Sequence, residues 1–248
     1  MLKSTSKSEV SDVARSLLDE VLATHGGIER WRSVTTITAW GRIGGLLPRR
    51  FAGNKLAEFL VRVRVAEQHT VLHGFPEAGM RAVFDQGVVR IERDDGECLQ
   101  RRVDPRLSFS GLSGLRRNVR WDPLDVAYFA GYAFWNYLTS PLLLTHDDVI
   151  VTDDGHRRLQ ATFGGGLDTH CREQAFRVGH DGLITRHDFV AKPVGRWASA
   201  TLRCDRHREF GGLVFATRRR VFPRGPGGLV LPRPTLLALE FDDIEVER

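Results

Sequence analysis

The stretch DPLDVAYFAGYAFWNYLTSPLLL (residues 122–144) is the longest candidate helix of the chain and separates two β-rich regions. Asp122 suits the N-cap position and Pro123 the first helical position, whereas Pro141 ends or kinks the helix. Nearly every face of the segment is apolar, which indicates burial on most sides. It is too short and too rich in tyrosine to span a membrane. We therefore predict an inserted helix over residues 122–140.

β-rich sequence flanks this helix on both sides. Before it, short apolar segments run from VTTITAWGRI (34–43) to ECLQRRV (97–103). After it, similar segments run from DVIVT (148–152) to LLALEFDDIEVE (236–247). Short strands that are separated by glycine-containing turns are typical of a meander of hairpins. The pattern predicts one long antiparallel sheet.

The N-terminal region is predicted to contain a second helix. Apolar side chains recur at helical spacing between Val13 and Leu22, and the pair Gly26-Gly27 ends the pattern. Residues 1–7 are polar and are predicted to be disordered. Because no repeat or change in composition marks a boundary, we predict one mainly β (α+β) domain over residues 1–248.

The composition is that of a folded protein rich in arginine. Hydrophobic residues make up 42% of the 248 residues, which supports a substantial core. The formal net charge is +5, and all but four of the 36 basic residues are arginine. The arginines are interleaved with 31 acidic residues, and no recognition helix or base-stacking motif accompanies them. Nucleic acid is therefore not predicted as a partner, and the oligomeric state is left open.

The sequence lacks motifs for metals, nucleotides and export. Cys98, Cys171 and Cys204 have neither the spacing of a zinc site nor that of a disulfide framework. No HExxH, GxSxG or phosphate-binding glycine loop occurs. The N-terminus lacks the apolar core of a signal peptide, and no apolar run is long enough for a membrane span. We predict a cytoplasmic protein that needs no metal or other cofactor.

Candidate chemistry is concentrated in the hairpin REQAFRVGHDGLITRHDF (172–189). Its HDG loop predicts a three-residue turn with a G1 bulge. In that register Glu173 and His187 share one face of the hairpin, and Arg172 shares the other face with Asp188. These pairs are either ordinary cross-strand salt bridges or, where a pair faces a cavity, an imidazole and carboxylate suited to general acid–base catalysis.

The next hairpin adds a second polar group. HREFGGLVF (207–215) turns on its two glycines, which places Asp205 opposite Arg218 with His207 on the same face. This group is either a solvated ladder of charges or a polar patch that adjoins the first, because consecutive hairpins of a meander are neighbours.

One stripe of the inserted helix is a candidate ligand-binding surface. Tyr128, Tyr132 and Trp135 recur at i, i+4 and i+7, a spacing that fits either core packing or the lining of a cavity. The tyrosine hydroxyls and the amide of Asn136 are polar groups that a ligand could use. Together with Arg172, these side chains are the predicted ligand contacts.

Four stretches carry a family resemblance: HGGIERW (25–31), DPLDVAYFAGYAFWNYLTSP (122–141), REQAFRV…DGLITRHDF (172–189) and HREFGGLVFATRRRVFPRG (207–225). They resemble uncharacterised bacterial proteins, and the order of elements resembles the bacterial lipoprotein-carrier (LolA/LolB-like) superfamily. The resemblance implies a half-barrel, in which a curved antiparallel sheet wraps a hydrophobic cavity and the inserted helix covers the concave face.

Two functions fit this predicted architecture. In the first, His187, Glu173, Asp188 and His207 are catalytic groups of a cofactor-free acid–base enzyme, a cyclase, isomerase or hydrolase that acts on a largely apolar small molecule. Burial and Glu173 then shift the pKa of His187 in opposite directions and leave it near neutrality. In the second, the protein binds or carries a hydrophobic ligand or lipid unchanged. The ionisable groups favour the enzyme, because a carrier needs few of them.

Overall fold

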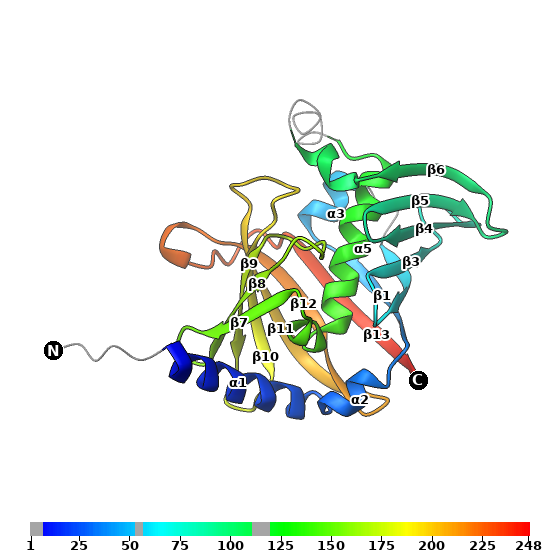
Figure 1. Ribbon diagram of the computed structural model, residues 1–248. Coiled ribbons are helices and arrows are strands. Elements are labelled where there is room, and N and C mark those ends of the chain that lie inside the picture. Colours follow the sequence, from blue (N-terminus) through cyan, green and yellow to red (C-terminus); the bar gives the residue numbers. More distant parts are fainter. Residues whose placement is uncertain (1–6, 53–56, 111–119) are drawn as a thin grey trace.

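The computed structural model describes residues 7–52, 57–110 and 120–248 (Figure 1). The strands of its first half are β1 (Thr36–Gly44), β2 (Glu58–Arg64), β3 (His69–His73), β4 (Met80–Asp85), β5 (Val88–Arg93) and β6 (Cys98–Val103). The strands of its second half are β7 (Val149–Asp153), β8 (Arg158–Phe163), β9 (Glu173–Val178), β10 (Ile184–Val190), β11 (Ser199–Phe210), β12 (Leu213–Pro223) and β13 (Leu237–Glu247).

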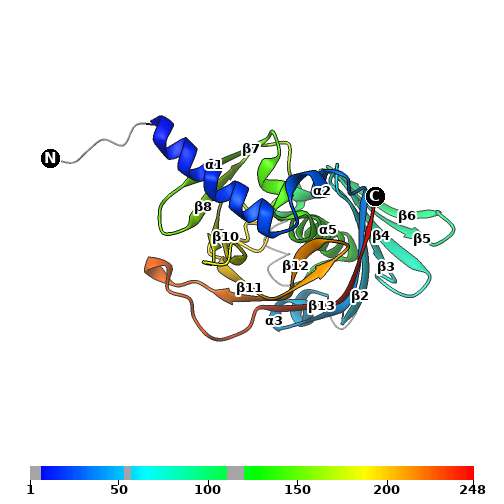
Figure 2. The same ribbon diagram turned by 90° about the horizontal axis from the view of Figure 1, so that it is seen from below.

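All these strands belong to one curved antiparallel sheet. Its order is β6-β5-β4-β3-β2-β1-β13-β12-β11-β10-β9-β8-β7, so two meanders are joined where the first strand pairs with the last. Gly41 permits this junction, because a Cβ there would lie 2.0 Å from the carbonyl oxygen of Glu240. The edge strands β6 and β7 stay apart, and the sheet forms an open half-barrel (Figure 2). The predicted mainly β half-barrel is thereby confirmed.

The inserted helix, α5 (Pro123–Thr139), lies across the concave face of the sheet (Figure 1). Asp122 caps it in a reciprocal box, since the backbone N–H of Asp125 donates to Asp122 Oδ1 at 2.9 Å and the N–H of Asp122 donates to Asp125 Oδ2 at 3.1 Å. Gly131 lets the helix approach β4, because a Cβ there would lie 2.4 Å from the Cβ of Phe84. The predicted N-cap and burial of this helix are confirmed.

The helix α1 (Lys7–Thr24) packs on β7 and β8, and the short α2 (Ile28–Arg32) follows it. Trp31 anchors this corner, because its side chain is fully buried and its Nε1 donates to the carbonyl oxygen of His25 at 3.0 Å. Residues 1–6 lie outside the described residues. Lys7, which the sequence groups with the disordered segment, instead begins α1.

One end of the sheet carries the elements that the sequence does not predict. The helix α3 (Leu46–Phe51) follows β1, and the 3-10 turn η3 (Pro226–Gly228) lies between β12 and β13. Because neighbouring strands are antiparallel and Gly44 pairs with Ala238, the β10–β11 connection lies at this end too. We call it the α3 end. The remaining 3-10 turns are η1 (Pro105–Phe109) and η2 (Leu142–Thr145).

Candidate functional site

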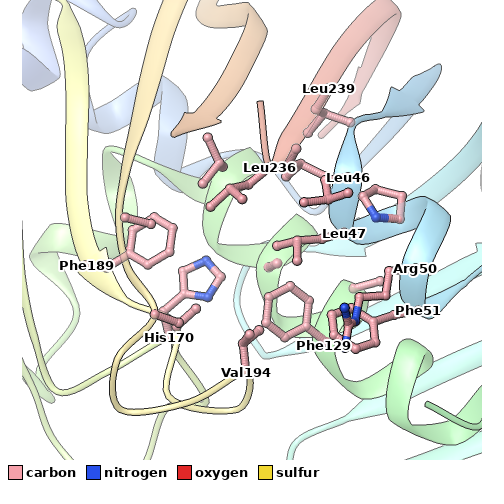
Figure 3. Close-up of a pocket in the computed structure, with 18 of the residues that line it drawn as sticks. Leu46, Leu47, Arg50, Phe51, Phe129, His170, Phe189, Val194, Leu236 and Leu239 are labelled. Atoms are coloured by element: carbon pink, nitrogen blue, oxygen red, sulfur yellow. The ribbon is translucent and has the colours of Figure 1, made fainter. Parts of the chain in front are cut away.

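An apolar cavity of about 530 Å³ lies between α5, α3 and strands β10–β13. Figure 3 shows Phe189 and His170 on one side of it and Leu46 and Leu47 on the other. The charged side chains among the described lining residues are Arg50 and Arg224, and none of these residues is a carboxylate. A volume of this size and an apolar wall with few polar groups are typical of small-molecule sites.

Small side chains of α5 leave room for the cavity. Val126, Phe129, Ala130, Ala133 and Tyr137 all line it, and they recur at the spacing of one helical face. The two alanines in the middle of this face project only a methyl group each. The cavity-lining face of α5 therefore lies on the other side of the helix from the predicted stripe.

His170 forms part of the wall and is held neutral. Its ring stacks on Phe189 with a centroid distance of 4.0 Å. Nδ1 lies 3.1 Å from the hydroxyl of Tyr132, and Nε2 lies 3.1 Å from the hydroxyl of Tyr137. Burial lowers the pKa of His170 well below its usual value. A neutral ring donates to one tyrosine and accepts from the other, so its polar atoms are satisfied within the protein.

The predicted stripe of α5 is core and does not line the large cavity. The hydroxyl of Tyr128 donates to Asp168 Oδ1 at 2.6 Å and accepts from Arg106 at 3.1 Å. Burial and the nearby Asp168 carboxylate raise the pKa of Tyr128. Trp135 Nε1 donates to the carbonyl oxygen of Arg64 at 2.7 Å, and Tyr132 is fully buried. The cavity-lining interpretation of this stripe is wrong, because protein groups take all three polar ends.

The predicted hairpin register is correct at the turn and wrong beyond it. Ile184 pairs with Val178, and the N–H of Gly179 donates to the carbonyl oxygen of Leu183 at 2.8 Å, which leaves the three-residue loop 180–182. In this loop Gly182 has the left-handed φ of 78° that the turn requires. A second bulge at Thr185 then shifts the register, so His187 pairs with Phe176. The shift exchanges the two faces of the strand.

The bulge separates His187 from Glu173. His187 instead stacks on Phe176 at a centroid distance of 4.2 Å, and its Nε2 lies 2.6 Å from Gln174 Oε1. Glu173 is exposed to solvent. Burial, with a smaller contribution from Arg219, lowers the pKa of His187 to about 3. The predicted value near neutrality is wrong, because no carboxylate offsets the loss of hydration.

His187 lies beneath α5 in a second, much smaller cavity of about 10 Å³. Asn136 lines this small cavity as well, and its Nδ2 lies 3.5 Å from the carbonyl oxygen of Asp168. Neither side chain lines the large cavity. The side chain of Asn136, a predicted ligand contact, therefore faces a space that holds about one water molecule.

The remaining predicted residues lie in three different places. Asp188 accepts from Arg186 Nε at 2.7 Å and from the Thr201 hydroxyl at 2.6 Å, so it is part of a buried polar cluster. His207 is half-buried with its ring 6.2 Å from that of His25, and its Nε2 lies 3.1 Å from the carbonyl oxygen of Ile184. Burial lowers the pKa of His207. Arg172 is exposed. The structure does not bring the four predicted catalytic side chains together.

Sequence reasoning missed the cavity wall that comes from outside α5. This wall includes the α3 segment and the β10–β11 connection, in which Val194 and Trp197 line the cavity. The available signals are the apolar pair Leu46-Leu47 directly after a strand and a tryptophan, Trp197, in a loop with one proline and one glycine. Both are weak signals, because single apolar residues on loops are common.

Over the residues that the structure describes, no three histidine, cysteine, aspartate or glutamate side chains are grouped so that they could hold a metal ion. Within the same ranges, no helix combines the length and apolar character that crossing a membrane requires.

No protein-family model matches the sequence, and no curated protein matches it. The chain is similar to the solved structure of a LolA superfamily protein from Nitrosomonas europaea, with 13% identity over 95% of this chain and 94% of the other and a TM-score of 0.49. A DUF1329 family protein from Desulfovibrio piger shows 13% identity over 94% and 93%, with a TM-score of 0.49. The lipoprotein LppX of Mycobacterium tuberculosis shows 12% identity over 94% of each chain, with a TM-score of 0.32.

Proposed function

We propose that the protein binds and carries a largely apolar small molecule in the large cavity. The observation that carries this proposal is the 530 Å³ space itself, whose described lining is mostly aliphatic and aromatic and contains no carboxylate. Burial of an apolar ligand there contributes about 25 cal/mol for each Å² removed from water. A cavity of this size can enclose most of a molecule the size of a drug or a fatty acid.

The placement of the ionisable groups supports binding over acid–base catalysis. His187 is enclosed away from the large cavity and has a pKa of about 3. His170 lies in the wall with both ring nitrogens engaged by tyrosines. A general base needs a pKa near the working pH and access to the substrate proton. The two buried histidines therefore fit a structural role.

Arg224 supports a ligand with one polar end. Its side chain lines the cavity, and its Nε is buried without a hydrogen-bond partner among the described residues. One terminal nitrogen lies 3.5 Å from Asp188 Oδ2, which holds the guanidinium at the wall. An unpaired buried donor costs about 1–3 kcal/mol, so a ligand acceptor placed there is favoured. An acyl or isoprenoid chain that ends in a carboxylate, hydroxyl or carbonyl has this chemistry.

The test is a titration with N-phenyl-1-naphthylamine, whose fluorescence rises in apolar surroundings. We expect saturable binding of one equivalent and competitive displacement by alkyl carboxylates, with affinity that increases with chain length. Native mass spectrometry of protein purified from its own host identifies a co-purifying ligand. A signal that rises linearly without saturation, or that alkyl compounds do not displace, refutes the proposal.

A further inference from the structure

Three chain segments form the rim of the cavity mouth, and they are residues 45–52, 190–199 and 223–236. Each contributes cavity-lining residues, such as Leu46, Val194 and Leu236, and continues onto the surface. All three lie at the α3 end of the sheet, away from α1 and α2 (Figure 1). The rim is thus one surface that surrounds the entrance.

The charged side chains of the rim are all basic. Its 32 residues contain six basic side chains and no acidic one. With 31 acidic residues in a chain of 248, an even distribution would place about four on the rim. Five of the six basic side chains are exposed, and they are Arg49, Arg50, Lys192, Arg196 and Arg233. The rim therefore has a positive potential although the whole chain carries a net charge of only +5.

Large apolar side chains are exposed on the same rim. Trp197 is 78% exposed, Leu229 is 65% exposed and Leu46 is 49% exposed. Gly195 makes room for the indole of Trp197, because a Cβ there would lie 2.5 Å from Nε1. Exposed apolar residues that gather beside cations at a cavity mouth mark an interaction surface. Tryptophan in particular is enriched at the interface between water and lipid.

We propose that the rim docks on the surface of an anionic lipid bilayer. Trp197, Leu229 and Leu46 would enter the interfacial layer, and the arginines would pair with lipid phosphates. The cavity mouth would then open toward the lipid, so an apolar ligand could pass between bilayer and cavity without crossing water. This transfer step rests on the proposed ligand cavity, whereas docking itself needs only the rim.

Two features favour a bilayer over another macromolecule. A nucleic acid attracts the cations but offers no apolar layer for three exposed side chains. A protein partner requires a matched acidic surface, whereas the bilayer adapts to a rim formed by three separate chain segments. The apolar side chains also border directly on the cavity, since Leu46 and Trp197 contribute to its lining.

The test is co-sedimentation with vesicles of phosphatidylcholine alone or mixed with about one third phosphatidylglycerol. We expect binding to the anionic vesicles only, and release when salt rises from about 0.1 M to about 1 M. The triple variant Arg49→Glu, Arg196→Glu, Arg233→Glu should bind at least about 100-fold more weakly, because each lost charge near the surface costs about fivefold. The control Arg15→Glu changes an exposed arginine of α1 and should bind as the wild type does.

The apolar contribution has a matched pair of variants. Leu229→Ser should reduce binding, whereas Ile150→Ser should not, although the two side chains are 65% and 67% exposed. Vesicles with brominated acyl chains should quench the wild-type fluorescence, and Trp197→Phe should abolish that quenching. Equal binding to neutral vesicles, or equal binding by the triple variant and the wild type, overturns the proposal.

A second readout separates docking from ligand binding. None of the three arginines in the triple variant lines the cavity, so its affinity for N-phenyl-1-naphthylamine without vesicles should equal that of the wild type. Normal probe binding by a wild-type protein that ignores anionic vesicles refutes docking alone. Vesicle binding by a wild-type protein that takes up no probe refutes the ligand cavity and leaves docking standing.

Discussion

Filling the cavity from the helix side is the most direct perturbation of the proposed function. Ala133 is buried on the cavity-lining face of α5, between Phe129 and Tyr137 along that face. The substitution Ala133→Phe points a phenyl ring into the 530 Å³ space. The protein gains apolar contacts, whereas the ligand loses the volume that the ring now occupies.

The expected effect follows from the size of the ring. A phenyl ring displaces roughly four methylene groups of an alkyl ligand, and each buried methylene contributes about 0.8 kcal/mol. Binding should therefore weaken by about 3 kcal/mol, which is on the order of a 100-fold increase in Kd. The melting temperature should stay the same or rise, because the ring fills existing space. Probe titration with alkyl carboxylates of increasing length measures the change, and the longest ligands should lose the most.

The control places the same ring on the surface. Ala66 is exposed in the turn between β2 and β3, and Ala66→Phe should leave affinity unchanged. If Ala133→Phe does not fold, Ala130→Phe fills the same space one turn earlier. Wild-type affinity in a folded variant at either position would show that the ligand binds elsewhere.

Three further predictions follow from buried polar groups. Burial lowers the pKa of His25 to about 4 and of His187 to about 3, and that of His170 well below its usual value. In the unfolded chain these histidines have pKa values near 6.5, so below that pH the unfolded chain binds more protons than the folded one. The contribution of the three histidines to the free energy of unfolding is therefore fully present above pH 6.5 and should fall by roughly 2 kcal/mol per histidine between pH 7 and pH 5. Urea denaturation at both pH values measures this change, and a flat profile contradicts it. His187→Gln should lower the free energy of unfolding by about 1–3 kcal/mol, because the stack on Phe176 and the hydrogen bond to Gln174 are lost. The exposed control Glu173→Gln should change it by less than about 0.5 kcal/mol. Equal effects of the two substitutions would argue against the assigned register. Arg224→Gln should weaken binding of an alkyl carboxylate about tenfold and leave that of the corresponding alkane unchanged, and calorimetry on both ligands tests whether the guanidinium contacts the polar end.

Features that local sequence chemistry determines could be predicted. Asp122 and Pro123 give the start of α5 because an N-cap and the first helical position need only neighbouring residues. The meander follows from glycine turns between short strands, and the predicted three-residue loop that ends at Gly182 is correct for the same reason. In each case the interactions that determine the local structure are made by residues a few positions apart in the sequence.

The prediction that His187 and Glu173 form a catalytic pair is wrong because nothing in the sequence indicates the bulge at Thr185. Neither neighbour of Thr185, Ile184 or Arg186, is a glycine, and the Thr185 hydroxyl donates to the carbonyl oxygen of Arg177 at 3.3 Å only after the chain has folded. A single extra residue turns His187 inward beside Phe176 and leaves Glu173 in water. Side-chain faces alternate with period two, so any error of one residue inverts every inference about a face.

The prediction that the Tyr128, Tyr132 and Trp135 face of α5 lines the cavity is wrong for a different reason. The same reason explains why the cavity exists. Large side chains of α5 pack where the helix touches the first meander, and Trp135 donates there to the carbonyl oxygen of Arg64 in β2. Tyr128 donates instead to Asp168, which lies in the connection between β8 and β9. The opposite side faces β10–β13 with the small side chains of Ala130 and Ala133, so helix and sheet do not meet closely. The cavity-lining face also carries Phe129 and Tyr137, so the two alanines between them, and not the absence of aromatic residues, mark the face that a ligand can reach. Because the sheet stays open between β6 and β7, the second meander can keep this distance while its inner face remains apolar. An apolar guest supplies the contacts that the two alanines leave unmade, which is the physical reason to expect binding at this position.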